Sequence, residues 1–291
     1  MKSILQTTAL VCAAVSLTMF TSSCCTRKPI PLTLTEPGYA TFIAHRGESF
    51  DAPENTLPAY KMAVDRGFGF ECDVYLSSDK KVFSFHDSNL KRTTGHDLPC
   101  NKASWADLVS KLDAGAWKGP QWKGTRPALL EEILTLARDG RYIYVEIKSG
   151  PEIVPYVKEI FAKQKTATPK NALFICFNKE VCKELKKRMP EYKVYWLSGS
   201  KTGRGKEAKP ITIDSILASL EETGADGLDV HFNPEIITAE FATAVKNAGY
   251  EFHVWTVDQL ETSLKAFAIG AQTVTTNCAK KQLDEFNATK K

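Results

Sequence analysis

The segment from residue 227 to residue 256 reads GLDVHFNPEIITAEFATAVKNAGYEFHVWT, and its pattern decides the fold. It contains a short apolar run at 227–230, apolar residues at helical spacing at 241–245 and a second apolar run at 252–256. Gly249 stands just past the helical stretch, where glycine commonly follows the end of a helix. The segment therefore predicts one strand–helix–strand unit.

The same alternation extends over most of the chain. Strand-like runs occur at 41–44, 68–73, 142–147, 172–176, 193–197, 227–230, 252–256 and 272–275. Residues at helical spacing separate most of these runs, at 57–64, 129–137, 153–161, 181–189, 213–220, 241–245 and 260–267. Eight strands that alternate with helices favour an α/β fold, the TIM (β/α)8 barrel. An open doubly wound sheet is the alternative that this pattern leaves open.

The connection after the second strand is longer than a barrel loop requires. Residues 80–85 predict an extra strand that pairs with the second strand as a hairpin. Residues 87–125 follow, and they contain Trp105, Trp117 and Trp122. A loop of this length in a compact domain usually has structure of its own. We therefore expect a small insertion after the second strand, at about 87–125, with its own apolar cluster.

Composition limits the classes of protein to consider. The chain has 291 residues, of which 43% are hydrophobic and 25% are charged, as in an ordinary folded protein. Its 38 Lys and Arg residues nearly balance its 34 Asp and Glu residues, which leaves a formal charge of +4. A strongly basic nucleic-acid binder is therefore excluded, and we expect no nucleic-acid partner.

The N-terminus has the features of an export signal. Lys2 is followed by an apolar stretch at 9–20 and by small residues at 21–23, directly before Cys24. The stretch is too short for a permanent transmembrane helix, because such a helix needs about 20 apolar residues. Small residues before a cysteine resemble the lipobox of bacterial lipoproteins, in which that cysteine is lipidated.

The lipobox resemblance predicts three parts of the chain: a signal and lipobox segment at 1–24, a linker at 25–40 and the barrel at 41–291. The protein would then be exported and lipid-anchored in the bacterial cell envelope or periplasm. Thr21 departs from the aliphatic residue that is usual at its position in a lipobox. Plain secretion with cleavage nearby is the alternative. The sequence does not fix the oligomeric state.

Polar residues gather where the predicted strands end. In a TIM barrel the C-terminal strand ends converge on one mouth, which holds the active site. The residues at these ends are His45, Arg46, Glu71, Asp73, His86, Glu146 and Lys148. Alternation along a strand places Glu71 and Asp73 on one face, and it places Glu146 beside Lys148. Three carboxylates are therefore expected in one small space.

Three carboxylates at this spacing need a compensating charge. They repel one another in a partly dry cavity unless a cation lies among them or their pKa values rise. An all-oxygen set favours a hard divalent cation, Ca²⁺ or Mg²⁺. For any single acid the simpler interpretation is an ion pair with Arg46 or Lys148. Three acids at corresponding strand ends favour the metal site.

His45 and His86 suggest acid–base chemistry beside that metal. Imidazole exchanges protons near neutral pH, so one ring can take a proton from a nucleophile and the other can supply one to a leaving oxygen. Arg46 and Lys148 add positive charge at the same mouth. Cations, a divalent metal and two histidines suit a substrate whose negative charge grows in the transition state, such as a phosphate ester.

Several motifs around these residues occur in a fixed order. They are His45-Arg46-Gly47, Pro53-Glu54-Asn55-Thr56, Glu71-x-Asp73-Val74, His86-Asp87, Asp113-Ala-Gly-Ala-Trp117, Glu146-x-Lys148 and Trp255-Thr256-Val257-Asp258. Together they resemble the glycerophosphodiester phosphodiesterase family, over about residues 42–276. The resemblance implies a TIM barrel that hydrolyses glycerophosphodiesters to glycerol 3-phosphate and an alcohol. It also implies that the 2-hydroxyl of the glycerol attacks the phosphorus.

The resemblance further implies roles for individual residues. The acid–base pair maps onto His45 and His86. The ligands of one divalent cation, Ca²⁺ or Mg²⁺, map onto Glu71, Asp73 and Glu146. The contacts to substrate map onto Arg46, Lys148 and Trp255. The last of these lines the glycerol or headgroup pocket or, in a purely structural role, packs the top of the barrel. Glu54 and Asn55 are expected to brace the first loop.

Two motifs depart from the family pattern. The family often ends its last strand in Thr-Asp-x-Pro, whereas this chain has Thr276-Asn277-Cys278-Ala279 there. It also has Asp258 where Asn is common. We expect both departures to affect substrate fit at the mouth and to leave the chemistry intact. Headgroup preference stays open, as do two other functions: a phospholipase D-like activity on lyso-lipids, and a lipid-anchored phosphoester-binding protein.

Overall fold

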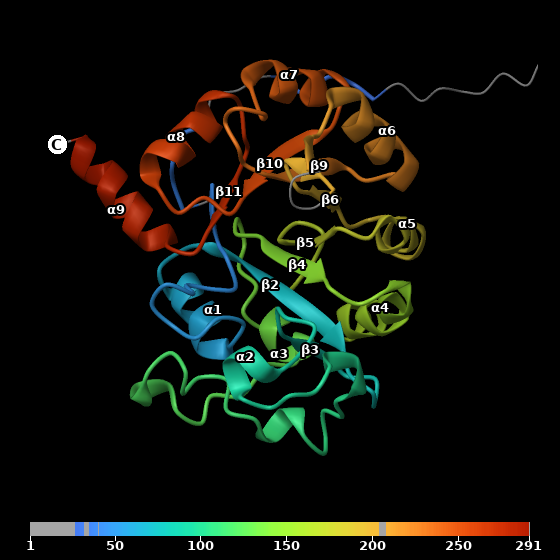
Figure 1. The fold of residues 1–291 in the computed structure, drawn as a ribbon, viewed down its shortest axis with the longest axis vertical. Coiled ribbons are helices and arrows are strands. Elements are labelled where there is room, and N and C mark those ends of the chain that lie inside the picture. Colours follow the sequence, from blue (N-terminus) through green and yellow to red (C-terminus); the bar gives the residue numbers. More distant parts are fainter. Residues whose placement is uncertain (1–26, 32–34, 40, 204–207, 291) are drawn as a thin grey trace, which may run out of the picture.

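Eight parallel strands close into a barrel (Figure 1). The computed structural model describes residues 27–31, 35–39, 41–203 and 208–290. The barrel strands are β1 (Phe42–Ala44), β2 (Gly69–Leu76), β4 (Ile143–Ile147), β5 (Ala172–Cys176), β6 (Val194–Ser198), β9 (Gly227–His231), β10 (Glu251–Trp255) and β11 (Val274–Thr276). β1 pairs with both β2 and β11, so the sheet has no free edge between them. The predicted TIM barrel is confirmed, and the open doubly wound sheet is wrong.

Helices surround the barrel. They are α1 (Leu57–Asp65), α3 (Leu130–Leu134), α4 (Val154–Lys163), α5 (Lys179–Arg188), α6 (Ile213–Thr223), α7 (Ala239–Asn247), α8 (Leu260–Ala268) and α9 (Ala279–Thr289). The sequence did not predict α9, because its buried face consists of Ala279, Gln282 and Leu283 and shows little apolar periodicity. Among the described helices, none combines the length and the apolar character needed to cross a bilayer. The predicted signal at 1–24 lies outside the described residues.

Two apolar layers position the site. One fills the barrel interior and includes Ile43, Tyr144, Ile175, Tyr195 and Leu197. The other lies between strands and helices, and it takes Phe70, Cys72 and Val74 from alternate positions of β2. The residues between them, Glu71 and Asp73, therefore face the barrel interior. Strand alternation thus buries two acids on the inner face of β2.

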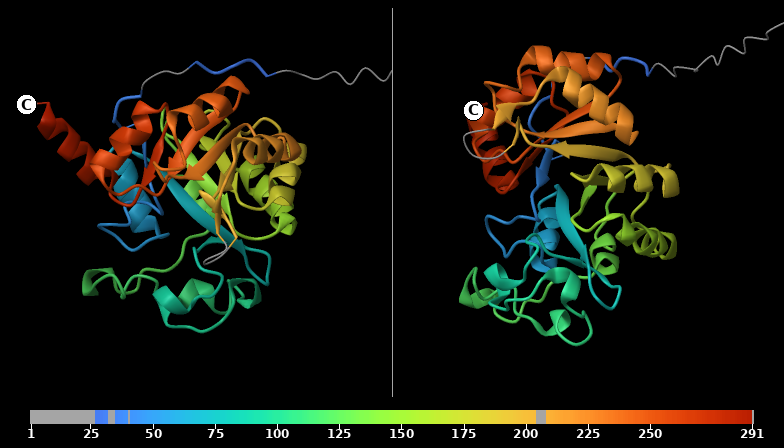
Figure 2. Two further views of the ribbon diagram at one scale, coloured as in Figure 1. Left: turned by 45° about the horizontal axis from the view of Figure 1, so that its top comes forward. Right: turned by 45° about the vertical axis from the view of Figure 1, so that its right-hand side comes forward.

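A lobe at one side of the barrel is formed by the segment that follows β2 (Figure 2). β3 (Val82–Ser84) pairs antiparallel with β2, as a hairpin partner. The segment continues through α2 (Lys91–Thr94) and three short 3-10 turns (Cys100–Lys102, Val109–Lys111 and Pro120–Trp122). Its apolar cluster consists of Phe83, Phe85, Leu90, Cys100, Ala103, Trp105 and Val109. Of the three tryptophans noted in the sequence, Trp105 joins this cluster, whereas Trp117 and Trp122 lie outside it.

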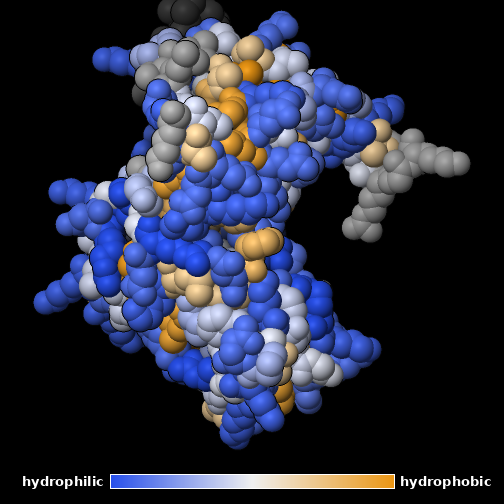
Figure 3. All heavy atoms as spheres, turned by 90° about the vertical axis from the view of Figure 1, so that its left-hand side faces the viewer, coloured by the Kyte–Doolittle hydropathy of each residue, from blue (hydrophilic) through white to orange (hydrophobic). Residues whose placement is uncertain are grey.

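Large exposed apolar side chains are scattered. The side of the molecule drawn in Figure 3 is mostly hydrophilic, and its apolar residues form small separate areas. The large exposed apolar residues in the described part of the chain are Tyr39, Phe50, Trp117, Phe177 and Leu264. One of them, Phe177, follows β5 at the barrel mouth and packs edge-on against Trp255, with ring centroids 5.6 Å apart. An aromatic wall therefore stands beside the predicted site.

Candidate active site at the barrel mouth

One cavity of about 170 Å³ brings the predicted residues together. Seven of the eight line it: His45, Arg46, Glu71, His86, Glu146, Lys148 and Trp255. The eighth, Asp73, is fully buried and ion-pairs with two of the others. Its carboxylate oxygens lie 3.4 Å from Arg46 Nε and 3.4 Å from Lys148 Nζ. The structure therefore places all eight residues in one connected site.

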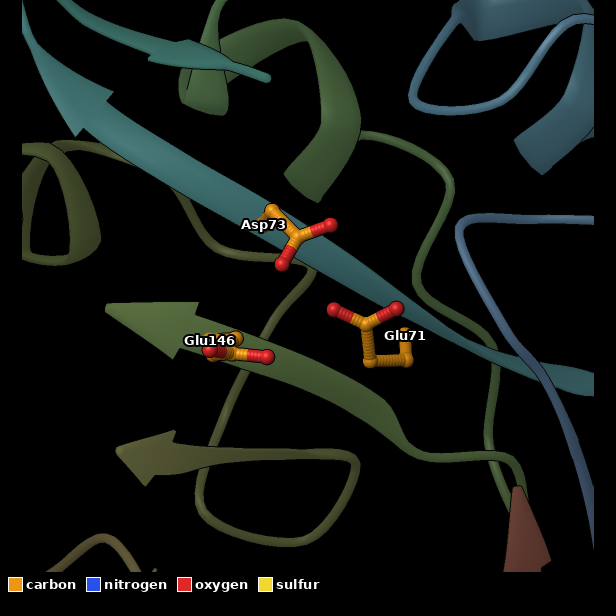
Figure 4. A group of neighbouring side chains, drawn as sticks. All are labelled: Glu71, Asp73 and Glu146. Atoms are coloured by element: carbon orange, nitrogen blue, oxygen red, sulfur yellow. The ribbon is translucent and has the colours of Figure 1, made fainter. Parts of the chain in front are cut away.

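The three acids converge from neighbouring strands (Figure 4). Glu71 and Asp73 come from β2, and Glu146 comes from β4, where it stands opposite Asp73 in the strand register. One oxygen from each residue lies within 4.8 Å of the other two. Glu71 Oε1 and Asp73 Oδ1 are buried and have no hydrogen-bond partner among the described residues. Orphaned carboxylate oxygens that converge in this way fit a hard divalent cation.

The charges of these acids are strongly perturbed. Burial raises the pKa of Glu71 well above its usual value, and Asp73 and Glu146 add to the rise. Burial, and then Asp73, likewise raises the pKa of Glu146. Burial opposes ionisation of Asp73 too, but Lys148 and Arg46 lower its pKa. Glu71 and Glu146 therefore tend to hold protons when no metal is bound, and a cation has to displace those protons in order to bind.

The turn after β1 orients His45 and holds the Glu71 carboxylate by a backbone hydrogen bond. Arg46 and Gly47 both have left-handed backbone angles, with φ of 56° and 79°. A Cβ on Gly47 would lie 2.5 Å from the carbonyl carbon of Ala59, so a side chain does not fit there. The Arg46 backbone N–H donates to Glu71 Oε2 at 2.8 Å. His45 Nε2 consequently lies 3.9 Å from the same carboxylate oxygen.

Asn55 and Glu54 support the charged groups directly. Asn55 Nδ2 donates to Asp73 Oδ2 at 2.8 Å, and the Asp73 backbone N–H donates to Asn55 Oδ1 at 3.1 Å. Glu54 accepts hydrogen bonds from Arg46 at 2.8 Å and from Arg92 at 2.6 Å. Both residues therefore contact groups outside the first loop, which they were expected to brace. Asn55 orients the candidate metal ligand Asp73, and Glu54 orients the candidate phosphate contact Arg46.

The two candidate acid–base histidines have different partners. His86 Nδ1 bonds Asp87 Oδ1 at 2.7 Å, and Asp87 in turn accepts a hydrogen bond from Arg92 Nε at 2.7 Å. His45 Nδ1 instead bonds the amide oxygen of Asn277 at 2.7 Å. Burial, and then the charge of Arg46, lowers the pKa of His45 to about 4. His45 is therefore neutral near pH 7.

The departures at 258 and 277 lie beside a candidate acid–base residue. Asn277 contacts His45 directly. Asp258 in turn accepts hydrogen bonds from the backbone and side-chain N–H groups of Asn277, at 2.8 Å and 2.7 Å. The sequence did not reveal this contact, because it joins residues 232 positions apart and only barrel closure brings β11 beside β1.

Sequence reasoning also missed Asp229, which lines the same cavity on β9. Both of its carboxylate oxygens, and the hydroxyl of nearby cavity residue Thr275, are buried without a hydrogen-bond partner in the described part of the chain. Burial, and then Glu146, raises the pKa of Asp229 well above its usual value. The signal was present in the sequence, because Asp229 occupies an inward-facing position in the predicted strand at 227–230.

Trp255 closes one side of the cavity. Its indole N–H donates to the backbone carbonyl of Asp229 at 3.1 Å, which fixes the ring against β9. The ring also packs edge-on against His231, with centroids 5.4 Å apart. Ile175 and Leu197 line the cavity between this wall and the acids. The cavity residues from β5, β6 and β10 are thus apolar or aromatic, with Asp229 on β9 among them, and those from β2 and β4 carry charges.

The fold and site together define a TIM-barrel protein whose mouth carries three carboxylates that could hold a metal ion, two cationic side chains and two histidines. Comparison with known proteins identifies the family. The chain belongs to the glycerophosphoryl diester phosphodiesterase family, whose model matches residues 45–281.

Individual relatives agree with this assignment. A glycerophosphodiester phosphodiesterase of Caldanaerobacter subterraneus is 34% identical over 156 residues, which cover 52% of this chain and 64% of that protein. A Bacillus subtilis glycerophosphodiester phosphodiesterase is 33% identical over 135 residues, covering 43% of this chain and 45% of the relative. These matches therefore span less than two thirds of the length of either relative.

Solved structures match over more of the chain. A phosphodiesterase of Oleispira antarctica, in complex with the product sn-glycerol-3-phosphate, has a TM-score of 0.73 and 27% identity. The match covers 85% of this chain and 96% of that one. A glycerophosphodiester phosphodiesterase of Thermotoga maritima has a TM-score of 0.64 and 25% identity, with 87% and 100% coverage.

Proposed function

We propose that this protein is a metal-dependent hydrolase that cleaves glycerophosphodiesters to glycerol 3-phosphate and an alcohol. The observation that carries the proposal is the convergence of three acids, two cations and two histidines on one cavity. Family membership supports it. Further support comes from the Oleispira antarctica relative, which was solved with sn-glycerol-3-phosphate as its product.

Glu71, Asp73 and Glu146 would hold one divalent cation, Ca²⁺ or Mg²⁺. The converging unsatisfied oxygens support this assignment. When bound, such a cation polarises phosphoryl oxygens and stabilises the charge that develops on them. Without it, Glu71 and Glu146 retain protons to a higher pH than ordinary carboxylates, as their raised pKa values indicate.

Arg46 and Lys148 would bind the phosphate oxygens. Burial opposes the charge on Lys148, but Glu146 and Asp73 outweigh it and raise its pKa, so the ammonium group stays charged at physiological pH. Arg46 Nε is buried and makes no hydrogen bond within the described residues, and its carboxylate neighbour is Asp73 Oδ2, at 3.4 Å in an ion pair. Both cations line the cavity beside the acids.

The histidines would exchange protons with the reacting oxygens. One ring takes the proton of the attacking glycerol 2-hydroxyl, and the other supplies a proton to the oxygen of the departing alcohol, which leaves a cyclic glycerol phosphate. Water then adds to the phosphorus and the bond to the 2-oxygen breaks, with the two proton transfers reversed, so that glycerol 3-phosphate is released. Each ring is held through Nδ1, by Asn277 for His45 and by Asp87 for His86. Nε2 is therefore the nitrogen that each ring can offer to substrate.

The remaining cavity surface suits a glycerol moiety. The side-chain oxygens of Asp229 and Thr275 lack hydrogen-bond partners, and glycerol hydroxyls can supply them. Trp255 and Phe177 form an apolar wall against which carbon atoms of the substrate can pack. A polyol attached to a phosphate matches a cavity that offers charged groups, unsatisfied oxygens and an aromatic wall.

The proposed location is the bacterial cell envelope or periplasm, with a lipid anchor at Cys24. Lys2, the apolar stretch at 9–20 and the small residues before Cys24 support it. Expression of the full chain with a labelled fatty acid tests the anchor. We expect label on the wild type and none on Cys24→Ser, and equal labelling of both would overturn the proposal.

A substrate panel tests the proposed reaction. Glycerophosphocholine, glycerophosphoethanolamine and glycerophosphoinositol should each release glycerol 3-phosphate, measured with a coupled dehydrogenase assay. Lyso-lipids are included in parallel. Faster turnover of lyso-lipids than of the water-soluble diesters would replace the proposal with a phospholipase D-like activity. Binding of the diesters without turnover would replace it with a binding protein.

A further inference from the structure

A chain of hydrogen bonds reaches His45 from two neighbouring strands. β11 runs parallel to β1 with Thr276 opposite Ala44, so the residues that follow, Asn277 and His45, lie side by side. Their side chains join through Asn277 Oδ1 and His45 Nδ1, 2.7 Å apart. Asp258, which lies beyond the end of β10, contacts the other end of the Asn277 amide. The chain therefore runs from Asp258 through Asn277 to His45.

The carboxylate of Asp258 fixes which way the Asn277 amide points. An ionised carboxylate only accepts hydrogen bonds, so the group 2.7 Å from Asp258 Oδ2 has to be the NH₂ of Asn277. The flipped amide would set two acceptor oxygens against each other at that distance. Ser49 Oγ also donates to Asn277 Oδ1, at 3.0 Å, which agrees with the same orientation. Asn277 therefore presents its oxygen to His45.

The orientation of the amide fixes the tautomer of His45. An amide oxygen accepts a hydrogen bond, so His45 Nδ1 carries the proton and donates it. In the neutral ring Nε2 is then unprotonated. That nitrogen lies 3.9 Å from Glu71 Oε2 and at the cavity. The ring thus offers its lone pair to the site where the substrate would react.

We infer that Asp258 is a positioning residue that holds His45 in one tautomer through Asn277. This inference rests on the proposed function, in which Nε2 exchanges a proton with the substrate. Asp258 has no role in it as a proton carrier and need not touch substrate. Its other hydrogen bonds, from Thr276 Oγ1 at 3.0 Å and from the Asn277 backbone N–H at 2.8 Å, keep its carboxylate in place.

The geometry also relates the departures at 258 and 277 to each other. The family resemblance described above implies Asn and Asp, respectively, at these two positions. Because the two side chains bond each other, an acid–amide pair is preserved with its members swapped. In the swapped arrangement an asparagine at position 258 would donate its NH₂ to an aspartate at position 277, and that aspartate would accept from His45 Nδ1. Either arrangement leaves Nε2 of His45 unprotonated. The feature that positions the ring is therefore an acid–amide pair at 258 and 277 in which the residue at 277 presents an oxygen to His45.

Three variants test this inference: Asp258→Asn, Asn277→Asp and the double exchange. Asp258→Asn removes the group that dictates the amide orientation, and Asn277→Asp sets two carboxylates against each other. Each single variant should lower kcat on glycerophosphocholine by about 10- to 100-fold, the usual range for a supporting residue. KM should change little, since neither residue is proposed to bind substrate. The double exchange should recover most of the lost kcat.

The matched control is Asp97→Asn. Asp97 is an exposed acid of the lobe that pairs with Lys91, so its variant should keep wild-type kcat and tautomer. The second readout is ¹⁵N NMR of histidine-labelled protein, with His45→Gln used to assign the signal. We expect the proton on Nδ1 of His45 in the wild type and in the double exchange. Asp258→Asn should show a mixture of both tautomers.

The outcomes separate this inference from the proposed function. If the wild type has no phosphodiesterase activity, the proposed function fails, and the tautomer measurement still decides whether Asp258 positions His45. Wild-type kcat together with an unchanged His45 tautomer in Asp258→Asn would overturn the inference. If Asp258→Asn does not fold, the double exchange decides, because it satisfies every bond of the chain. A double exchange that folds but is no more active than Asn277→Asp would also overturn it.

Discussion

The two histidines at the mouth differ in burial, partner and supporting structure. His45 follows β1, a strand of the closed barrel, and 15% of its side chain is exposed. His86 follows β3, the hairpin strand outside the barrel, and 33% of its side chain is exposed. The partner of His45 is the neutral amide of Asn277, whereas that of His86 is the carboxylate of Asp87. One proposed proton-transfer group is therefore built into the barrel, and the other is supplied next to the lobe.

This difference suggests what the lobe contributes. Arg92, which holds Asp87, belongs to α2 of the lobe, and it also reaches back to Glu54 in the first barrel loop. Glu54 in turn accepts from Arg46, beside His45. A row of ion pairs thus runs across the mouth from His86 through Asp87, Arg92 and Glu54 to Arg46, the residue after His45. The lobe therefore contributes Arg92 to the support of both regions.

The largest expected effect comes from removing a proposed metal ligand that also lies beside His45. Glu71→Ala should lower the release of glycerol 3-phosphate by at least about 10³-fold, because it removes a proposed metal ligand and the acceptor that locks the Arg46 turn. Metal binding, followed by isothermal titration calorimetry, should be lost together with activity. The control is Glu285→Gln on the exposed face of α9. Wild-type metal affinity in Glu71→Ala would contradict the metal assignment.

Replacing each histidine separately is the next largest test. His45→Gln and His86→Gln should each lower kcat by about 10²- to 10⁴-fold, the range for loss of a general acid or base. A substrate with an activated phenolate leaving group needs no protonation of that group. The variant of the histidine that protonates the leaving oxygen should therefore keep much more activity on such a substrate. Equal losses of kcat by both variants on both substrates would contradict the proposal that one ring acts on the nucleophile and the other on the leaving oxygen.

Asp87→Asn tests whether His86 needs a carboxylate as its hydrogen-bond partner. The change breaks the ion pair with Arg92 and gives His86 a neutral partner like that of His45. We expect kcat to fall by about 10- to 100-fold with little change in KM. The matched control is Asp107→Asn, which alters an exposed acid of the same lobe. A wild-type kcat would mean that His86 works without its carboxylate partner.

The smallest predicted effect is a pH dependence of stability. Glu71 and Glu146 have raised pKa values in the folded, metal-free protein, so their stabilising contribution is complete below pH 4.5 and is lost as pH rises through the raised pKa values. Metal-free protein should therefore melt at a lower temperature at pH 8 than at pH 5, relative to Glu71→Gln. The expected shift is on the order of 2–4 °C for each kcal/mol.

Added Ca²⁺ or Mg²⁺ should reverse that trend, because a cation needs the ionised carboxylates and binds more tightly as pH rises. Differential scanning calorimetry of wild type and Glu71→Gln, with and without the cation, measures both effects. A melting temperature of the metal-free wild type that rises from pH 5 to pH 8 as in Glu71→Gln would contradict the account of these acids.

The sequence predicted the barrel from the alternation of strands and helices, and it predicted seven of the eight candidate site residues from the polar ends of those strands. The eighth, Trp255, came from the family resemblance alone. Inward-facing positions at the C-terminal strand ends are readable along the chain, which is how Glu71, Asp73 and Glu146 were found. Asp229 obeys the same rule and could have been identified. The bond between Asn277 and His45 could not, because it depends on closure of the barrel between β11 and β1.

Regions without periodicity were also beyond prediction. The lobe is made of short turns around Trp105, and its helices are too brief to leave a repeating pattern. α9 packs through a mostly polar face, with Gln282 buried and bonded to Ser263. Where burial is polar, hydrophobic spacing gives no signal, and hydrogen-bond partners become visible only in the folded structure.

The central claim is that the acids at the mouth hold a divalent cation that glycerophosphodiester hydrolysis requires. The most direct test is glycerol 3-phosphate release from glycerophosphocholine after chelation, followed by re-addition of Ca²⁺ or Mg²⁺ to wild type and to Glu285→Gln. We predict that chelation abolishes activity in both proteins and that one of the two cations restores it. Turnover that continues at the original rate in the presence of chelator would contradict the claim.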